Sequence, residues 1–282
     1  MMNQRSWVVL RTLINRYDPN KQEALLRFLP PNEQQAVLSQ DVHSYHLEPL
    51  LYQHQDTLDR MHYSWLIPLL DQFSESVLPL FVSALSPQQA AGFQSRKLPH
   101  LHLAQSLKLF MRTQLYSQLE INNRLPLDFL PETDLTPLAY YDKKELMAMN
   151  DFLGLYDLAS EVRRIVNKTH LKNIYTCLSS KQFYYLKACL HQKEKLVGPP
   201  LGFDPSKPDC TKLKQLIHRR GLMRLGKALC GQHKDLVWYI THTLDTGRGK
   251  ILLNQYKPEP IPTVTSFLQL QVINVMNFLK SE

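Results

Sequence analysis

Apolar residues recur at helical spacing along most of this chain, and this periodicity constrains the fold more than any other feature. Leu213, Leu216 and Ile217 lie at positions i, i+3 and i+4. Strict alternation of apolar and polar residues, which marks a half-buried strand, is almost absent, and glycine is scarce, at 9 residues. An apolar stripe on a helix needs a neighbouring helix to cover it. The pattern therefore predicts an all-α protein. The closing stripe of the chain comprises Leu268, Val272, Val275, Met276 and Leu279.

A boundary motif indicates how these helices are joined. Residues 29–38 resemble residues 85–93 and, more loosely, residues 178–186. In the second and third copies Ser86 and Ser179 suit the N-cap position, and each is followed three residues later by a Gln that can complete a capping box. Each copy ends one helix and starts the next. We therefore expect short helical hairpins that stack into a superhelix or a bundle.

Two proline-rich segments divide the chain. Residues 124–137 contain three prolines, and residues 198–208 contain four prolines and two glycines. Helices do not cross such composition. We expect an N-terminal helical domain at 1–124, a middle helical domain at 125–197, a linker at 198–208 and a basic C-terminal helical domain at 209–282.

Positive charge is concentrated toward the C-terminus. Residues 1–176 carry 17 Lys and Arg against 18 Asp and Glu, whereas residues 177–282 carry 16 against 7. Such asymmetry points to an anionic partner for the C-terminal part, although a solvated basic face that keeps the protein soluble gives the same pattern.

The cysteines and the apolar runs bear on the compartment. The four cysteines, Cys177, Cys189, Cys210 and Cys230, include no Cys-x-x-Cys pair, so we expect no zinc cluster. The N-terminus lacks the apolar core of a secretory signal, and no run reaches the roughly 20 apolar residues of a membrane span. We therefore expect reduced thiols in a cytoplasmic protein that meets the inner membrane only through a partner.

A glycine-rich stretch at 247–250 invites comparison with a phosphate-binding loop. That motif requires a Gly five residues before its Gly-Lys pair and a Ser or Thr after it, and Leu244 and Ile251 occupy those positions here. We therefore expect no nucleotide site. No nucleophile elbow and no Cys/His signature is present either.

Histidine pairs are the remaining candidates for chemistry. His43 and His46 lie three residues apart, and His100 and His102 lie two apart. Neither pair is accompanied by acidic or Cys residues at a recognised metal spacing. We expect no enzyme activity, no metal, no cofactor and no small-molecule substrate.

A cation-rich helix beginning near residue 209 is the strongest candidate for a binding surface. Because Leu213, Leu216 and Ile217 mark its buried side, most of its cations are expected to face water. Gly221 can break this helix in two, so a helix–turn–helix lying on nucleic acid stays open as an alternative. The cations of the helix are Lys212, Lys214, Arg219, Arg220, Arg224 and Lys227.

The C-terminal third resembles the C-terminal domain of the flagellar motor switch protein FliG. Asp209 starts a helix, residues 227–231 match an Ala-Leu-x-Gly turn, and residues 235–244 supply the next helix. Arg248 takes the position of an Arg in that family, and it joins the predicted basic surface. A proline-rich break at 258–262 and a closing apolar helix complete the resemblance, which covers about 70 residues.

The resemblance implies an all-α, armadillo-like, multi-domain superhelix of stacked helical hairpins. It implies a non-enzymatic adaptor or scaffold in a flagellar or type III secretion complex. It implies contacts with an inner-membrane ring protein and with FliM/FliN-like or sorting-platform proteins. Cys210 and Thr211 replace charged residues of the helix that meets the stator in that family. A secretion-base role of the SctK accessory type therefore fits better than torque generation. A type III secretion chaperone and a nucleic-acid-binding protein are the alternatives.

Overall fold

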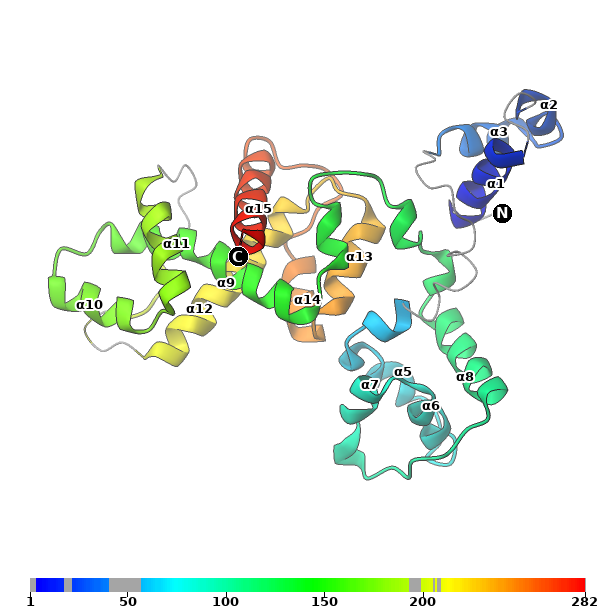
Figure 1. Ribbon diagram of the computed structural model, residues 1–282, viewed down its shortest axis with the longest axis horizontal. Helices are drawn as coiled ribbons and strands as arrows, with labels where there is room; N and C mark the ends of the chain where they lie inside the picture. Colours follow the sequence, from blue (N-terminus) through cyan, green and yellow to red (C-terminus); the bar gives the residue numbers. More distant parts are fainter. Residues whose placement is uncertain are drawn as a thin grey trace. The chain divides into compact units, whose positions relative to one another are not determined.

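The chain is a two-unit helical protein in a computed structural model that describes residues 4–17, 22–40, 57–192, 199–204, 206 and 209–281. Every regular element in these ranges is a helix, which confirms the prediction of an all-α protein. One compact unit spans Met1–Thr136 and the other spans Pro137–Glu282 (Figure 1).

This division differs from the predicted domains. The predicted middle domain at 125–197 and C-terminal domain at 209–282 lie almost entirely within the second unit. The physical reason is the packing of α9 (Lys143–Val162) against α12 (Cys210–Ala228), which joins the two segments into one core. Proline composition stops a helix, but it does not prevent the helices on either side of it from packing together.

The first unit is built from short helices. Its first three helices enclose a small core that contains Trp7, Ile14, Leu26 and Val37. The helices are α1 (Gln4–Tyr17), α2 (Gln22–Leu26), α3 (Pro31–Leu38), α5 (Ile67–Leu70), α6 (Leu78–Ala84), α7 (Pro87–Ala91) and α8 (Gln105–Gln118). Its 3₁₀ turns are η2 (Tyr63–Trp65), η3 (Gln94–Arg96), η4 (Ile121–Asn123) and η5 (Leu127–Phe129), and η6 (Thr136–Tyr140) spans the boundary between the units.

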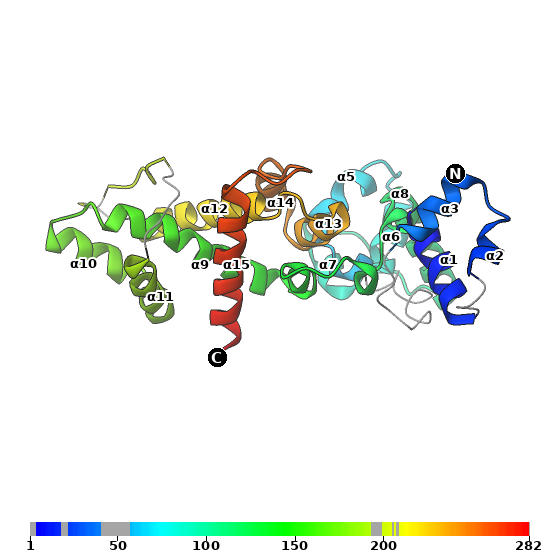
Figure 2. The ribbon, with the colours of Figure 1, turned by 90° about the horizontal axis from the view of Figure 1, so that it is seen from above.

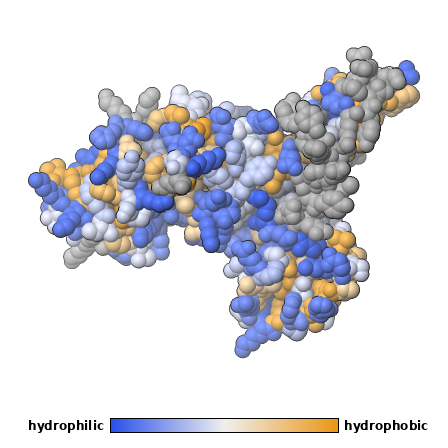
Figure 3. All heavy atoms as spheres, in the orientation of Figure 1, coloured by the Kyte–Doolittle hydropathy of each residue, from blue (hydrophilic) through white to orange (hydrophobic). Residues whose placement is uncertain are grey.

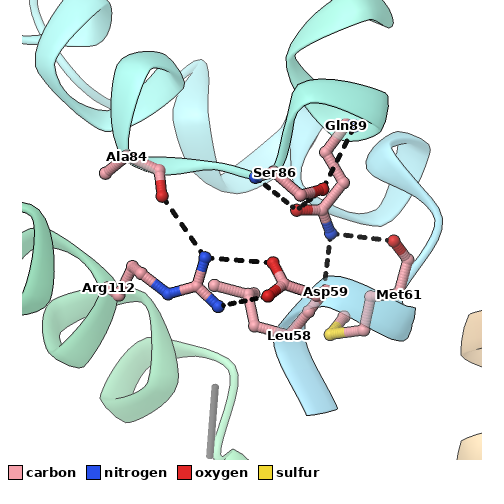
Figure 4. Close-up of polar contacts among 7 residues, drawn as sticks. All are labelled: Leu58, Asp59, Met61, Ala84, Ser86, Gln89 and Arg112. Atoms are coloured by element: carbon pink, nitrogen blue, oxygen red, sulfur yellow. Dashed lines mark hydrogen bonds and ion pairs between the residues drawn. The ribbon is translucent and has the colours of Figure 1, made fainter. Parts of the chain in front are cut away.

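A buried polar cluster holds the helices of the first unit together (Figure 4). The guanidinium of Arg112 donates to both carboxylate oxygens of Asp59, at 3.0 and 2.9 Å, and to the carbonyl oxygen of Ala84. Gln89 completes the predicted capping box with Ser86, and its amide nitrogen donates to the carbonyl oxygens of residues 58 and 61. These bonds satisfy buried backbone groups, which indicates a structural role for the cluster.

The second unit contains the longer helices. Both ribbon views show α15 crossing α9 and α12 (Figures 1 and 2), and all three pairs among these helices are in contact. The predicted capping box of Ser179 and Gln182 is present at the start of α11. Besides α9 and α12, the helices are α10 (Lys168–Thr176), α11 (Ser180–His191), α13 (Lys234–Thr243), α14 (Thr246–Leu253) and α15 (Val264–Lys280).

Two glycines allow α9 and α12 to approach closely. A Cβ atom at Gly221 would lie 1.7 Å from the carbonyl oxygen of Asn150, and one at Gly154 would lie 2.0 Å from that of Ile217. Gly221 therefore serves helix packing and does not break the helix, because α12 continues from Cys210 to Ala228. This corrects the helix–turn–helix interpretation, which required two short helices at this point.

Candidate partner-binding surface

The first half of α12 presents cations to solvent. Asp209 caps the helix through Oδ1, which accepts from the backbone N–H groups of residues 211 and 212. Leu213 and Ile217 are each 1% exposed and form the inward stripe, as the sequence predicted. Lys212, Lys214 and Arg219 are exposed, and none of their side chains forms an ion pair with a residue that the structure describes.

Arg220 is half-buried and holds part of the proline-rich segment against the helix. Its Nη2 donates to the carbonyl oxygens of Pro199 and Pro200, at 2.7 and 2.9 Å. Leu201 is buried, and its backbone N–H donates to Oε1 of Glu161. This guanidinium is therefore partly engaged within the protein.

Arg224 lies inside the unit and not on its surface. The residue is 7% exposed. Its guanidinium forms a bidentate ion pair with Asp157, at 2.7 and 3.2 Å, and donates to Oε1 of Gln271 at 2.6 Å. One cation thus ties together α9, α12 and α15. The sequence pattern predicted Arg224 on the binding surface. The prediction is wrong because local periodicity does not show which polar positions meet another helix.

Arg248 is also drawn into internal contacts. Its Nε donates to Nε2 of His218 at 2.9 Å, and its Nη1 pairs with Asp245. Because His218 accepts at Nε2, its proton lies on Nδ1, which donates to Asp151 over 2.7 Å. The Nζ atom of Lys143 lies 3.9 Å from Asp245. A chain of polar contacts therefore runs from α9 through α12 to the start of α14.

The polar contacts around Asp245 lower the pKa of its carboxylate. Burial alone would raise its pKa, but the backbone N–H and the guanidinium of Arg248 outweigh burial and hold the pKa below its ordinary value. Asp245 also caps α14 through the N–H of Arg248.

The last predicted cation, Lys227, is half-buried in the final turn of α12. The exposed part of the predicted surface thus narrows to Lys212, Lys214 and Arg219.

A disulfide joins Cys177 to Cys210, with 5.0 Å between their Cα atoms. The sequence predicted reduced thiols, so this pairing is a correction. The bond connects the end of α10 to the first residue of α12. Two cysteines 33 positions apart carry no sequence signal for pairing, because the tertiary fold brings them together. Cys189 and Cys230 are buried and lie outside this disulfide.

The glycine-rich stretch and the histidine pairs are the other candidate sites in the sequence. Residues 247–250 lie within α14, so this stretch is helix and not a loop. His43 and His46 lie outside the described residues, whereas His100 and His102 lie in the segment that precedes α8. Across the described ranges, no group of three or more His, Cys, Asp or Glu side chains has a metal-binding arrangement.

The chain matches no protein-family model, no curated protein and no solved structure. Among the helices that the structure describes, none combines the length and the apolarity needed to cross a lipid bilayer. The function therefore has to be inferred from the residues themselves.

Proposed function

We propose that this protein is a non-enzymatic adaptor in the cytoplasmic part of a flagellar-type or type III secretion complex. In this role it links an inner-membrane ring protein to FliM/FliN-like or sorting-platform proteins, and it meets the membrane only through that ring. The observation that carries the proposal is the solvent-facing cationic side of α12, made by Lys212, Lys214 and Arg219, whose side chains form no ion pair with any residue that the structure describes. An acidic protein surface is the complementary partner.

The internal roles of Arg224 and Arg248 support a scaffold over a motor part. Both guanidinium groups are engaged by carboxylates of the same unit, at Asp157 and Asp245. A guanidinium held in an internal ion pair would have to break that pair before it could form transient contacts with a stator. The proposal also includes the FliG-like, armadillo-type stacking of helices, for which the recurring capping boxes at the starts of α7 and α11 are the support.

The test is direct binding to purified ring and sorting-platform proteins, measured by biolayer interferometry. The triple variant K212E/K214E/R219E should weaken binding at least tenfold, because three attractive charges become repulsive. The matched control is K144E/K250E/K257E, which reverses three exposed lysines elsewhere in the unit and should change affinity less than twofold. Absence of binding to every ring or platform component, or equal loss in both variants, would refute the proposal.

Nucleic-acid binding is the second candidate, because the same exposed cations suit phosphate groups. A duplex bound through about six to ten phosphates would lose roughly 10³-fold or more in affinity between 50 and 200 mM salt. If the chain binds duplex DNA with such a slope, if K212E/K214E/R219E abolishes that binding, and if no ring component binds, this second function replaces the adaptor.

A further inference from the structure

An open groove lies between α10 and α11, and its lining includes none of the exposed cations of α12 that carry the proposed function. Its volume is about 530 Å³, within the range of pockets that take small ligands or a few anchoring side chains. On the face drawn in Figure 3, hydrophobic and hydrophilic residues alternate over these two helices, at the left end of the view. The groove is lined by apolar and cationic residues, among them Lys168, Leu171, Lys172, Tyr175, Leu178 and Phe183.

The walls of the groove are apolar and only half-covered. Leu171, Tyr175, Leu178 and Phe183 are all half-buried. Leu171 and Tyr175 are four residues apart, which places them on one face of α10, and Leu178 follows the end of this helix. An uncovered apolar strip of this kind fits the anchoring side chains of a peptide segment.

The chain segment that forms the groove carries only positively charged side chains among its charged residues. Residues 163–192 contain six Lys and Arg and no Asp or Glu. Lys168 and Lys172 are exposed, and they lie one turn apart on α10. The disulfide places the first turn of α12, which bears Lys212, beside the end of α10. Asp209, the acid next to this junction, is engaged as the cap of α12.

We propose that this groove binds an acidic amphipathic helix of a partner protein. Apolar side chains of that helix fill the strip between α10 and α11, and its carboxylates face Lys168 and Lys172. The proposal rests on the adaptor function for its choice of a protein as partner, and it adds a second contact of defined chemistry.

The aromatic residues of the groove favour a peptide over single-stranded nucleic acid. Base stacking needs open ring faces. The rings of Tyr175 and Phe183 contact each other, with centroids 4.9 Å apart, and the ammonium of Lys187 lies 4.5 Å from the centre of the Phe183 ring. Neither Leu171 nor Leu178 can stack on a base. Shape and charge together therefore select an acidic, partly apolar segment.

The experiment measures binding of a labelled synthetic helix to the full chain by fluorescence anisotropy. The peptide has about 20 residues, with Leu at i, i+3, i+4 and i+7 on one face and Glu on the other. Two control peptides replace every Leu by Ser or every Glu by Gln. A fourth probe is an oligo(dT) strand of about 20 nucleotides, which tests the nucleic-acid alternative.

Variant K168E/K172E should weaken binding of the Leu/Glu peptide about tenfold, whereas the control K144E/K250E should change it less than twofold. All four lysines in these two variants are exposed, so their replacement should leave the fold unchanged. Leu171→Gln should weaken the same peptide without changing the binding of its Leu-to-Ser form.

Three outcomes overturn the groove proposal: equal affinity of K168E/K172E and its control, equal binding of the peptide that lacks Leu, or tighter binding of oligo(dT) at the same residues. Failure of the adaptor function would look different. In that case the acidic helix still binds the groove, while purified ring and platform proteins do not bind the chain.

Discussion

At the scale of single residues, Arg224 has a predicted position on the surface and an observed position in the interior. In the sequence it is one of a series of cations on a basic helix. In the structure it is 7% exposed and bridges Asp157 and Gln271 on two other helices. A buried charge of this kind is stable only while its partner is present.

Replacing Arg224 by Ala should lower the free energy of unfolding by about 3–5 kcal/mol, because Asp157 is left buried without its partner. The matched variant Arg219→Ala removes an exposed guanidinium from the same helix and should cost less than about 0.5 kcal/mol. Urea denaturation measures both. A loss below about 1 kcal/mol for Arg224→Ala would show that the ion pair is not formed.

Asp245 gives a pH prediction with a defined sign. Its pKa is held below the ordinary value of an Asp, so the folded state binds its proton less readily than the unfolded state. The stability it contributes is fully present above the ordinary pKa of about 4 and is lost as the pH falls through the lower, folded value.

Asp245→Asn should therefore lose less stability than the wild type between pH 6 and pH 3, as measured by urea denaturation at the two pH values. Glu259→Gln, which removes an exposed carboxylate, serves as the control and should follow the wild type. If Asp245→Asn and the wild type show the same pH dependence, Asp245 is not tied to Arg248 in solution.

At the scale of elements, the crossing of α9 and α12 decides the core of the second unit. The two helices meet where Gly154 and Gly221 leave room for backbone carbonyl groups. Asn150, fully buried at this crossing, donates from its side chain to the carbonyl oxygen of Leu146 one turn earlier. The caps of both helices, Asp142 and Asp209, are local features that the sequence already carries.

Gly221→Ala should destabilise the unit by about 1–3 kcal/mol, even though Ala is the better helix former by about 1 kcal/mol. The added Cβ meets the Asn150 carbonyl, a backbone atom that cannot move aside without separating the helices. Gly247→Ala is the control, since its Cβ finds its nearest atom at 3.4 Å. A stabilised Gly221→Ala protein, by thermal or urea unfolding, would contradict this helix crossing.

The Cys177–Cys210 disulfide closes a loop with a sequence separation of 33 and joins α10 to α12. Loss of this bond in Cys210→Ser should lower the free energy of unfolding by about 3–4 kcal/mol on the chain-entropy estimate. A reductant should have the same effect on the wild type and none on Cys210→Ser. Cys189→Ser replaces a buried thiol outside the disulfide and serves as the control. A reductant should destabilise this variant as it does the wild type.

Titration of the unreduced, denatured chain gives an independent check of this bond. Two of the four cysteines should react with a thiol reagent, because Cys189 and Cys230 are not part of a disulfide. Four reactive thiols in protein purified without reductant would show that the bond does not form.

At the scale of the whole molecule, the chain consists of two compact units, with the boundary at residues 136 and 137. The proline-rich segment at 124–137 lies at this boundary, and the segment at 198–208 lies inside the second unit. The core of that unit is shared between α9, α12 and α15. Its stability should therefore depend on residues from both sides of the second proline-rich segment.

Residues 137–282 expressed alone should be helical by circular dichroism and should unfold cooperatively in urea. Residues 209–282, the predicted C-terminal domain, are the matched fragment. They should not unfold cooperatively, because the α12 face that packs on α9 is uncovered. A stable, cooperative 209–282 fragment would support the predicted domain boundary over the observed one.

The sequence by itself determined the helical class of the fold and several of the helix starts. The apolar spacing of Leu213 and Ile217 and the capping pairs Ser86–Gln89 and Ser179–Gln182 act over three or four residues, so they can be recognised without tertiary information. Only the tertiary structure decided which cations stay in solvent and which cysteines pair. Arg224 meets Asp157 across 67 residues, and Cys177 meets Cys210 across 33. Contacts over such separations arise from the packing of whole helices, which no local pattern specifies.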